Sequence, residues 1–115
     1  MASFAELKRV GLALPGVEEF RHRGEPALRV RGRMFAVWWP PSKITIMKLE
    51  REHQRMLFEV RPEVFSPCRV GTGTWSYVEI AKLSNKDLKA LVIEAWMQVT
   101  PMTARRAWLA RRPQP

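Results

Sequence analysis

Four strand-like segments follow one another in the first half of the chain, separated only by short breaks that contain glycine or proline. In the second segment apolar and arginine side chains alternate strictly, which is the pattern of a half-buried strand. Gly32 follows directly and indicates a tight turn into the third segment, whereas Pro40 and Pro41 end that segment because proline cannot continue a central strand. Segments joined by such short turns favour an antiparallel meander. The predicted strands span residues 17–23, 27–31, 33–39 and 43–49.

Helical periodicity surrounds these strands on both sides. The first helix opens with Ser3 and Glu6, a capping box, and the strongest helix opens with Ser84 and Asp87 at the same spacing. Prolines and glycines in residues 62–73 predict an irregular segment with room for one short strand. The predicted apolar face of the second helix consists of His53, Met56, Leu57 and Val60. The predicted helices span residues 4–13, 50–61, 85–99 and 102–111, and a last strand spans residues 74–80.

This order of elements predicts an α+β domain, α-β(4)-α-β-α-α, in which helices pack on one face of an antiparallel sheet of about five strands. A length of 115 residues suits a single domain. We assign residues 1–100 to its body and residues 101–115 to a basic helix and tail of the same domain. No apolar run reaches the ~20 residues of a membrane-spanning helix, and the first residues lack the pattern of a signal peptide. We therefore expect a cytoplasmic protein without a membrane partner.

The charge balance is the strongest functional signal, because 20 Lys and Arg stand against 11 Asp and Glu, a net charge of +9. Residues 1–33 contain seven basic and four acidic side chains. Residues 34–100 contain nine basic and seven acidic side chains, and residues 101–115 contain four basic and no acidic side chains. The excess therefore lies at the two ends of the chain. A positive field of this kind attracts nucleic acid, an anionic membrane surface or an acidic protein.

Motifs at four places occur in the order that is typical of a known family. They are an LPGVEE segment at residues 14–19, a basic-Gly-basic-x-Phe-Ala hairpin at residues 31–36, a strand ending in lysine at residues 46–48 and a tryptophan-bearing strand at residues 75–78. From about residue 5 to about residue 100 the chain resembles the MmcQ/YjbR family of small bacterial proteins. The resemblance implies a frataxin/CyaY-like fold and DNA binding through paired wing-like hairpins. Residues 71–74 depart from the family, which commonly has a basic residue shortly before the late tryptophan.

The arginines of the predicted hairpins are the candidate DNA contacts. Residues two apart on a strand point the same way, so Arg29 and Arg31 share a face, as do Arg21 and Arg23. If these strands pair across residues 24–26, four guanidinium groups line one patch, and their planar forks suit phosphate. The alternative is that they are the solvated side of a half-covered sheet. The candidate nucleic-acid contacts are Arg21, Arg23, Arg29, Arg31, Arg33, Lys43, Arg105 and Arg106.

Three tryptophans allow more than one role. Trp108 lies among the tail arginines, where it either stacks on nucleic acid or anchors the last helix to the core, the role that we favour. Trp38 and Trp39 are adjacent on a strand, so their rings face opposite ways. One ring is expected in the core, and the other is exposed or covered by a partner.

Residues for catalysis or metal binding are few. His22 and His53 have no second ligand at metal-binding spacing, and the lone Cys68 is more typical of a packed residue than of a thiolate paired with histidine. We therefore predict no catalysis, no cofactor and no metal. The sequence favours a non-catalytic domain that contacts DNA phosphates with little base specificity.

Two other interpretations remain open. In one, the domain is an adaptor that uses the sheet face and Trp38 or Trp39 against an acidic protein partner. In the other, it binds a small ligand in a cleft between sheet and helices that contains Glu18, His22 or Cys68.

Overall fold

The computed structural model describes residues 2–40, 44–68 and 73–111. The elements follow the predicted order with two additions, a short strand between the second helix and the last predicted strand and a 3-10 turn after that strand. They are α1 (Phe4–Leu12), β1 (Val17–His22), β2 (Glu25–Val30), β3 (Arg33–Trp39), β4 (Ile44–Lys48), α2 (Arg51–Val60), β5 (Phe65–Pro67), β6 (Trp75–Val78), the 3-10 turn η1 (Ile80–Lys82), α3 (Asn85–Val99) and α4 (Met102–Arg111). The α+β class is confirmed.

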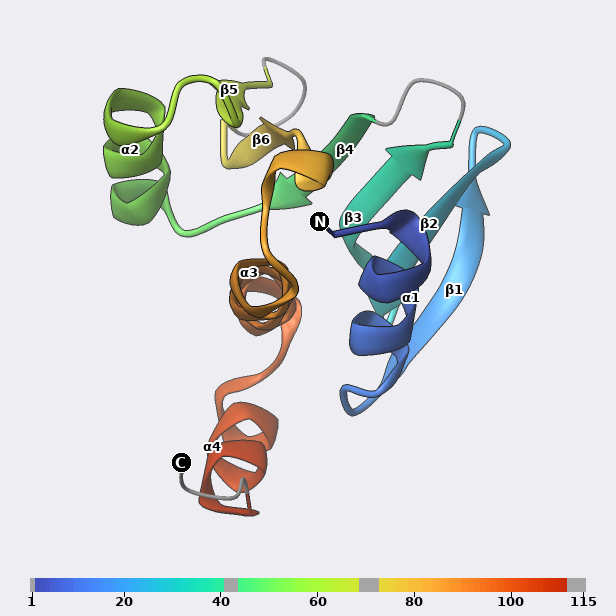
Figure 1. Ribbon diagram of the computed structural model, residues 1–115. Coiled ribbons are helices and arrows are strands. Elements are labelled where there is room, and N and C mark those ends of the chain that lie inside the picture. Colours follow the sequence, from blue (N-terminus) through green and yellow to red (C-terminus); the bar gives the residue numbers. More distant parts are fainter. Residues whose placement is uncertain (1, 41–43, 69–72, 112–115) are drawn as a thin grey trace.

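The strands form one antiparallel sheet in the order β1-β2-β3-β4-β6-β5. The meander of the first four strands is confirmed. The sheet has six strands rather than about five, because the segment predicted to be irregular contributes β5 at the edge, paired with β6. Figure 1 shows α1 and α3 lying together against the sheet, α2 beside β5 and α4 below α3.

The two faces of the sheet are covered differently. The larger core cluster lies between sheet and helices, and all four α-helices contribute to it, with Leu7, Leu57, Trp96 and Trp108 as one example from each. The smaller cluster on the opposite face consists of Ala27, Val37, Ile46 and Cys68, with Phe20, Met34, Trp39 and Trp75 packed against it. No helical residue in the described part of the chain belongs to this second cluster. We call this side of the sheet the open face.

The predicted caps and tryptophan orientations are confirmed. Ser3 Oγ accepts a hydrogen bond from the Glu6 backbone N–H, and Ser84 Oγ accepts one from that of Asp87. Trp38 is 3% exposed in the core between sheet and helices, whereas Trp39 is half-buried on the open face.

The predicted apolar face of α2 is right for Leu57 and wrong for Met56 and Val60, and the position of the helix in the chain is right. The helix buries Gln54 and Leu57, while Met56 and Val60 are 46% and 65% exposed. The reason is a polar contact with the sheet, because Gln54 Nε2 donates to the Trp75 carbonyl at 3.1 Å and to Ser76 Oγ at 2.7 Å. None of the helices in the described ranges combines the length and apolarity needed to cross a membrane.

Candidate nucleic-acid interface

Each end of β2 carries a two-residue turn made of arginine and glycine. Arg23 and Gly24 join β1 to β2 with φ angles of 52° and 85°, and Arg31 and Gly32 join β2 to β3 with 51° and 79°. Positive φ at both central residues defines the type I′ turn, which matches the twist of a hairpin and favours Asn-Gly. Arginine at the first position is uncommon, because its Cβ is crowded in this backbone region.

The two turns hold Arg23 and Arg31 far apart. β2 contains six residues, so its ends are separated by roughly 17 Å. Figure 1 shows the turn between β1 and β2 at the top of the view, and Arg31 therefore lies at the opposite end of the strand. The predicted patch of four converging guanidinium groups is wrong, because pairing of β1 with β2 makes Arg23 a turn residue and a second turn carries Arg31 away.

Arg21 and Arg29 do not converge either. Arg29 lies on the open face, where its Nε is 2.7 Å from Glu18 Oε1 and its guanidinium is 4.4 Å from the centre of the Phe20 ring. Arg21 alternates with Phe20 along β1 and therefore points to the helix side of the sheet. Arg29 is thus neutralised by a carboxylate, and Arg21 lies on the opposite face.

The other predicted arginines lie on two elements, Arg31 and Arg33 at the turn between β2 and β3 and the remaining ones on α4. Val30, which precedes this turn, pairs with Val17 at the start of β1. Two residues earlier, the Pro15 carbonyl accepts a hydrogen bond of 2.9 Å from Trp96 Nε1, and Trp96 contacts Trp108 of α4 edge-on at 5.3 Å. This chain of contacts supports the anchoring role of Trp108. We give the arginines of these two elements the common name basic end; they are Arg31, Arg33, Arg105, Arg106 and Arg111.

The charges of the basic end are not balanced by acidic neighbours. Across residues 2–40, 44–68 and 73–111, no carboxylate lies within 4.0 Å of any of its five guanidinium groups. Four of the five side chains are exposed, and Arg105 is half-buried. Elsewhere in the described chain, five of the twelve Lys and Arg side chains have such a partner, as in Lys8 with Glu19 at 3.1 Å.

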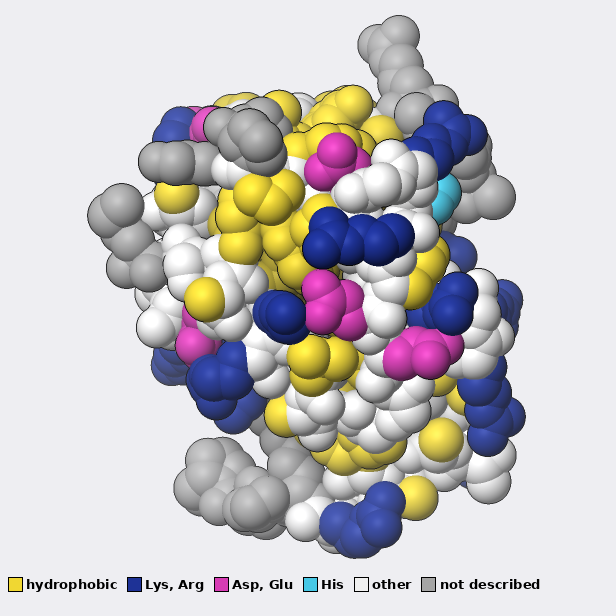
Figure 2. Space-filling model, turned by 90° about the vertical axis from the view of Figure 1, so that its right-hand side faces the viewer, with side chains coloured by type: hydrophobic (Ala, Val, Ile, Leu, Met, Phe, Trp, Pro, Cys, Tyr) yellow, Lys and Arg dark blue, Asp and Glu magenta, His cyan; other side chains and the backbone are white. Residues whose placement is uncertain are grey.

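Figure 2 shows the β1 side of the molecule, where magenta Asp and Glu side chains lie beside dark blue Lys and Arg side chains in the middle of the view, whereas the lower third shows dark blue side chains but no magenta ones. Lys43, also a predicted contact, lies outside the described residues.

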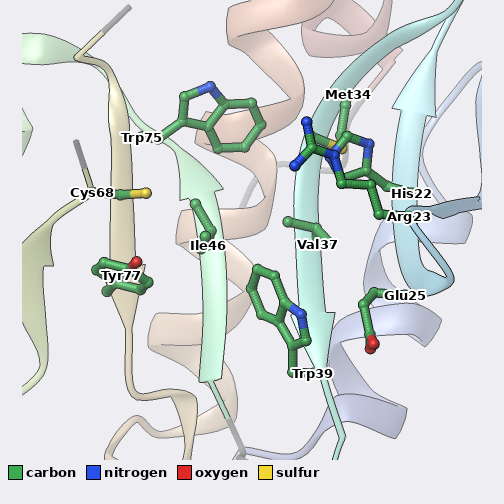
Figure 3. Close-up of a pocket in the computed structure, with 10 residues that line it drawn as sticks. All are labelled: His22, Arg23, Glu25, Met34, Val37, Trp39, Ile46, Cys68, Trp75 and Tyr77. Carbon is green, nitrogen blue, oxygen red and sulfur yellow. The ribbon is translucent and has the colours of Figure 1, made fainter. Parts of the chain in front are cut away.

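The open face contains a hollow of about 560 Å³ (Figure 3). His22 and Cys68 line it, two of the residues that the small-ligand interpretation names, whereas Glu18 is paired with Arg29 instead. The predicted location between sheet and helices is wrong, because the hollow lies on the face of the sheet that the described helices leave uncovered. Tyr77 also lines the hollow, and its pKa is raised above the ordinary value. The larger cause is the charge of Cys68, and the second is the hydrogen bond between Cys68 and Tyr77. Sequence reasoning missed Trp75 and Tyr77 here, although two aromatic residues two positions apart on a strand could have indicated a shared aromatic face. Within the described ranges, no three His, Cys, Asp or Glu residues are grouped to hold a metal ion.

Fold and charge thus describe a small α+β domain with one open sheet face and one cationic end. The YjbR family model matches residues 12–98, so the chain belongs to the YjbR family. The crystal structure of Deinococcus radiodurans protein DR2400, which carries the family-model domain DUF419, is similar to it with a TM-score of 0.77 and 20% sequence identity. The similarity covers 96% of this chain and 89% of that one and concerns the fold. No curated protein matches the chain.

Proposed function

We propose that this YjbR-family protein is a non-catalytic domain that binds DNA through its phosphates, with little base specificity, and that the basic end makes the contact. The observation that carries the proposal is the group of five arginines without carboxylate partners in the described chain. An exposed guanidinium without an acidic partner keeps its charge for an external anion, and its planar fork can donate two parallel hydrogen bonds to a phosphate.

The anchoring of α4 strengthens the proposal. Trp108 packs against the buried Trp96, so the arginines of α4 are carried by a helix that is attached to the core. A fixed arrangement loses less conformational entropy on binding than a flexible tail does. Arg21 and Arg23 lie away from the basic end, and Arg29 is paired with Glu18, so these three arginines make no direct phosphate contact in this proposal.

The test is a fluorescence anisotropy titration of a short DNA duplex at about 50 and 200 mM salt. The diagnostic variant is Arg31→Asn, which suits the type I′ turn while removing the charge. We expect it to weaken binding by about fivefold, equivalent to about 1 kcal/mol, and to reduce the slope of log affinity against log salt by about 1. Substituting the duplex sequence should change affinity little.

Arg23→Asn is the matched control, because it makes the same substitution in the same type of turn with the same change in net charge, at the other end of β2. We expect it to bind DNA as the unsubstituted protein does. Equal weakening by both variants would show that net charge alone attracts DNA, and undetectable or salt-independent binding would remove the proposal.

A further inference from the structure

The hollow on the open face has the form of a small-molecule site. Its floor is apolar and solid, because Val37 and Ile46 are 3% and 9% exposed and belong to the second core cluster. Figure 3 shows Trp75 and Trp39 on two sides of this floor, with Ile46 and Val37 between them. A volume of about 560 Å³ lies within the range of roughly 300–1,000 Å³ that is common for small-ligand pockets.

The polar groups of the hollow lie at its rim. Figure 3 shows Arg23 and His22 near Met34, and Glu25 on the side of Trp39. No carboxylate among the described residues is within 4.0 Å of the Arg23 guanidinium. The turn nevertheless holds this arginine at a φ of 52°, where its side chain lines the hollow. One side of the rim therefore presents an unpaired cation and the other a carboxylate.

We propose that this hollow binds a small, flat aromatic molecule that carries one anionic group. The ring lies over Val37 and Ile46 between the two indoles, because aromatic faces and edges give such a ring both contact area and favourable geometry. The anionic group lies at Arg23, the unpaired cation of the rim. Glu25 repels a second negative charge near Trp39, so the site selects against molecules with an anion at each end.

This proposal is independent of DNA binding. Arg23 is separated from Arg31 by the length of β2, roughly 17 Å, so one ligand group cannot contact both arginines. Aromatic carboxylates and mononucleotides both present a flat ring with an anion, and the experiment below distinguishes these two sources.

The experiment titrates the full chain with 2-naphthoate, with its neutral analogue 2-naphthylmethanol and with adenosine monophosphate, following quenching of tryptophan fluorescence and, in parallel, the heat of binding. We expect 2-naphthoate to bind about fivefold more tightly than the neutral analogue, because of the added hydrogen bond to a charged group. Arg23→Asn should abolish this preference and leave the neutral analogue unaffected. Arg31→Asn, the matched control, should retain the preference. Trp75→Ala should weaken both naphthyl compounds, and its thermal unfolding shows whether the variant folds.

The proposal fails if none of the three probes binds at about 1 mM, or if every bound probe binds equally well to the Arg23→Asn and Arg31→Asn proteins. It also fails if the chain forms a dimer in solution that excludes 2-naphthoate, because the open face is then an interface between copies. Tighter binding of adenosine monophosphate identifies a nucleotide as the source of the aromatic anion, and tighter binding of 2-naphthoate identifies a carboxylate. The DNA titration of the same variants reports separately on the basic end.

Discussion

Replacing Arg31 by Asn should stabilise the fold, although the proposed function makes the same change harmful for DNA binding. Arg31 has a φ of 51° at the first central position of a type I′ turn. The left-handed region costs most residues about 1–2 kcal/mol and Asn less, because its short polar side chain can bond locally. Arg31 is exposed and has no acidic partner within the described chain, so its removal costs little. We expect the free energy of unfolding to rise by about 0.5–1 kcal/mol.

For a domain of this size the expected increase corresponds to a rise of about 2–6 °C in the midpoint of thermal unfolding. The assay is urea unfolding followed by tryptophan fluorescence, because Trp96 is fully buried and contacts Trp108. Arg23→Asn changes the same kind of turn at φ 52° and should stabilise by a similar amount. The double variant should show the sum of both effects, since the turns are too far apart to couple.

Arg31→Ala separates turn strain from charge repulsion, because alanine removes the charge but gains nothing from the left-handed backbone. If the two Arg31 variants are equally stable, relief of the net positive charge explains the gain. If Arg31→Asn leaves the free energy of unfolding unchanged or lowers it, the argument from turn strain is refuted.

Two further predictions concern α1 and α2. Gly11→Ala should lower the free energy of unfolding, measured in a urea titration, by about 1 kcal/mol. The new Cβ overlaps Cδ1 of the fully buried Leu28, and this overpacking outweighs the helix propensity that alanine gains. A rise in the free energy of unfolding would show that Leu28 can move. Hydrogen bonds from the backbone N–H groups of Glu52 and His53 lower the pKa of the Glu50 carboxyl from its ordinary value of 4.5. The ionised carboxyl therefore stabilises the folded protein above pH 4.5, and this stabilisation is lost as the pH falls through the lower pKa of the folded state. Glu50→Gln should therefore show a smaller fall in thermal midpoint between about pH 6 and pH 3, and an unchanged fall would contradict the capping role.

Local signals were enough to predict most of the fold. The caps at Ser3 and Ser84 depend on side chains three residues from the group that they bond, and the turn at Gly32 depends on the backbone angles of two adjacent residues, Arg31 and Gly32. The buried face of α2 could not be predicted in this way. Gln54 is buried because β6, more than twenty residues later, supplies its hydrogen-bond acceptors, and apolar periodicity cannot detect such a partner.

The candidate site shows the same limit. Sequence alone identified Arg31, Arg33 and the arginines near Trp108, but not their arrangement. The attachment of α4 to the core depends on Trp96, which packs on Trp108 and bonds the carbonyl of Pro15, 81 residues earlier. Alternation along the strands likewise predicted that Arg29 shares a face with other arginines. It could not predict that Glu18 lies across the strand pair from Arg29 and neutralises it.

The two arginine-glycine turns make the proposed functions separable by experiment. A variant that loses binding often does so because it is less stable, and loss of function then says little about contact. Here both substitutions relieve backbone strain, so Arg31→Asn and Arg23→Asn should each raise stability while each weakens a different binding activity. A more stable protein that is weakened only in DNA binding, and another that loses only its preference for an aromatic anion, cannot both be explained by unfolding. Strain at Arg31 and Arg23 is then the structural consequence of placing a guanidinium group at each end of β2, where asparagine would be the more stable residue.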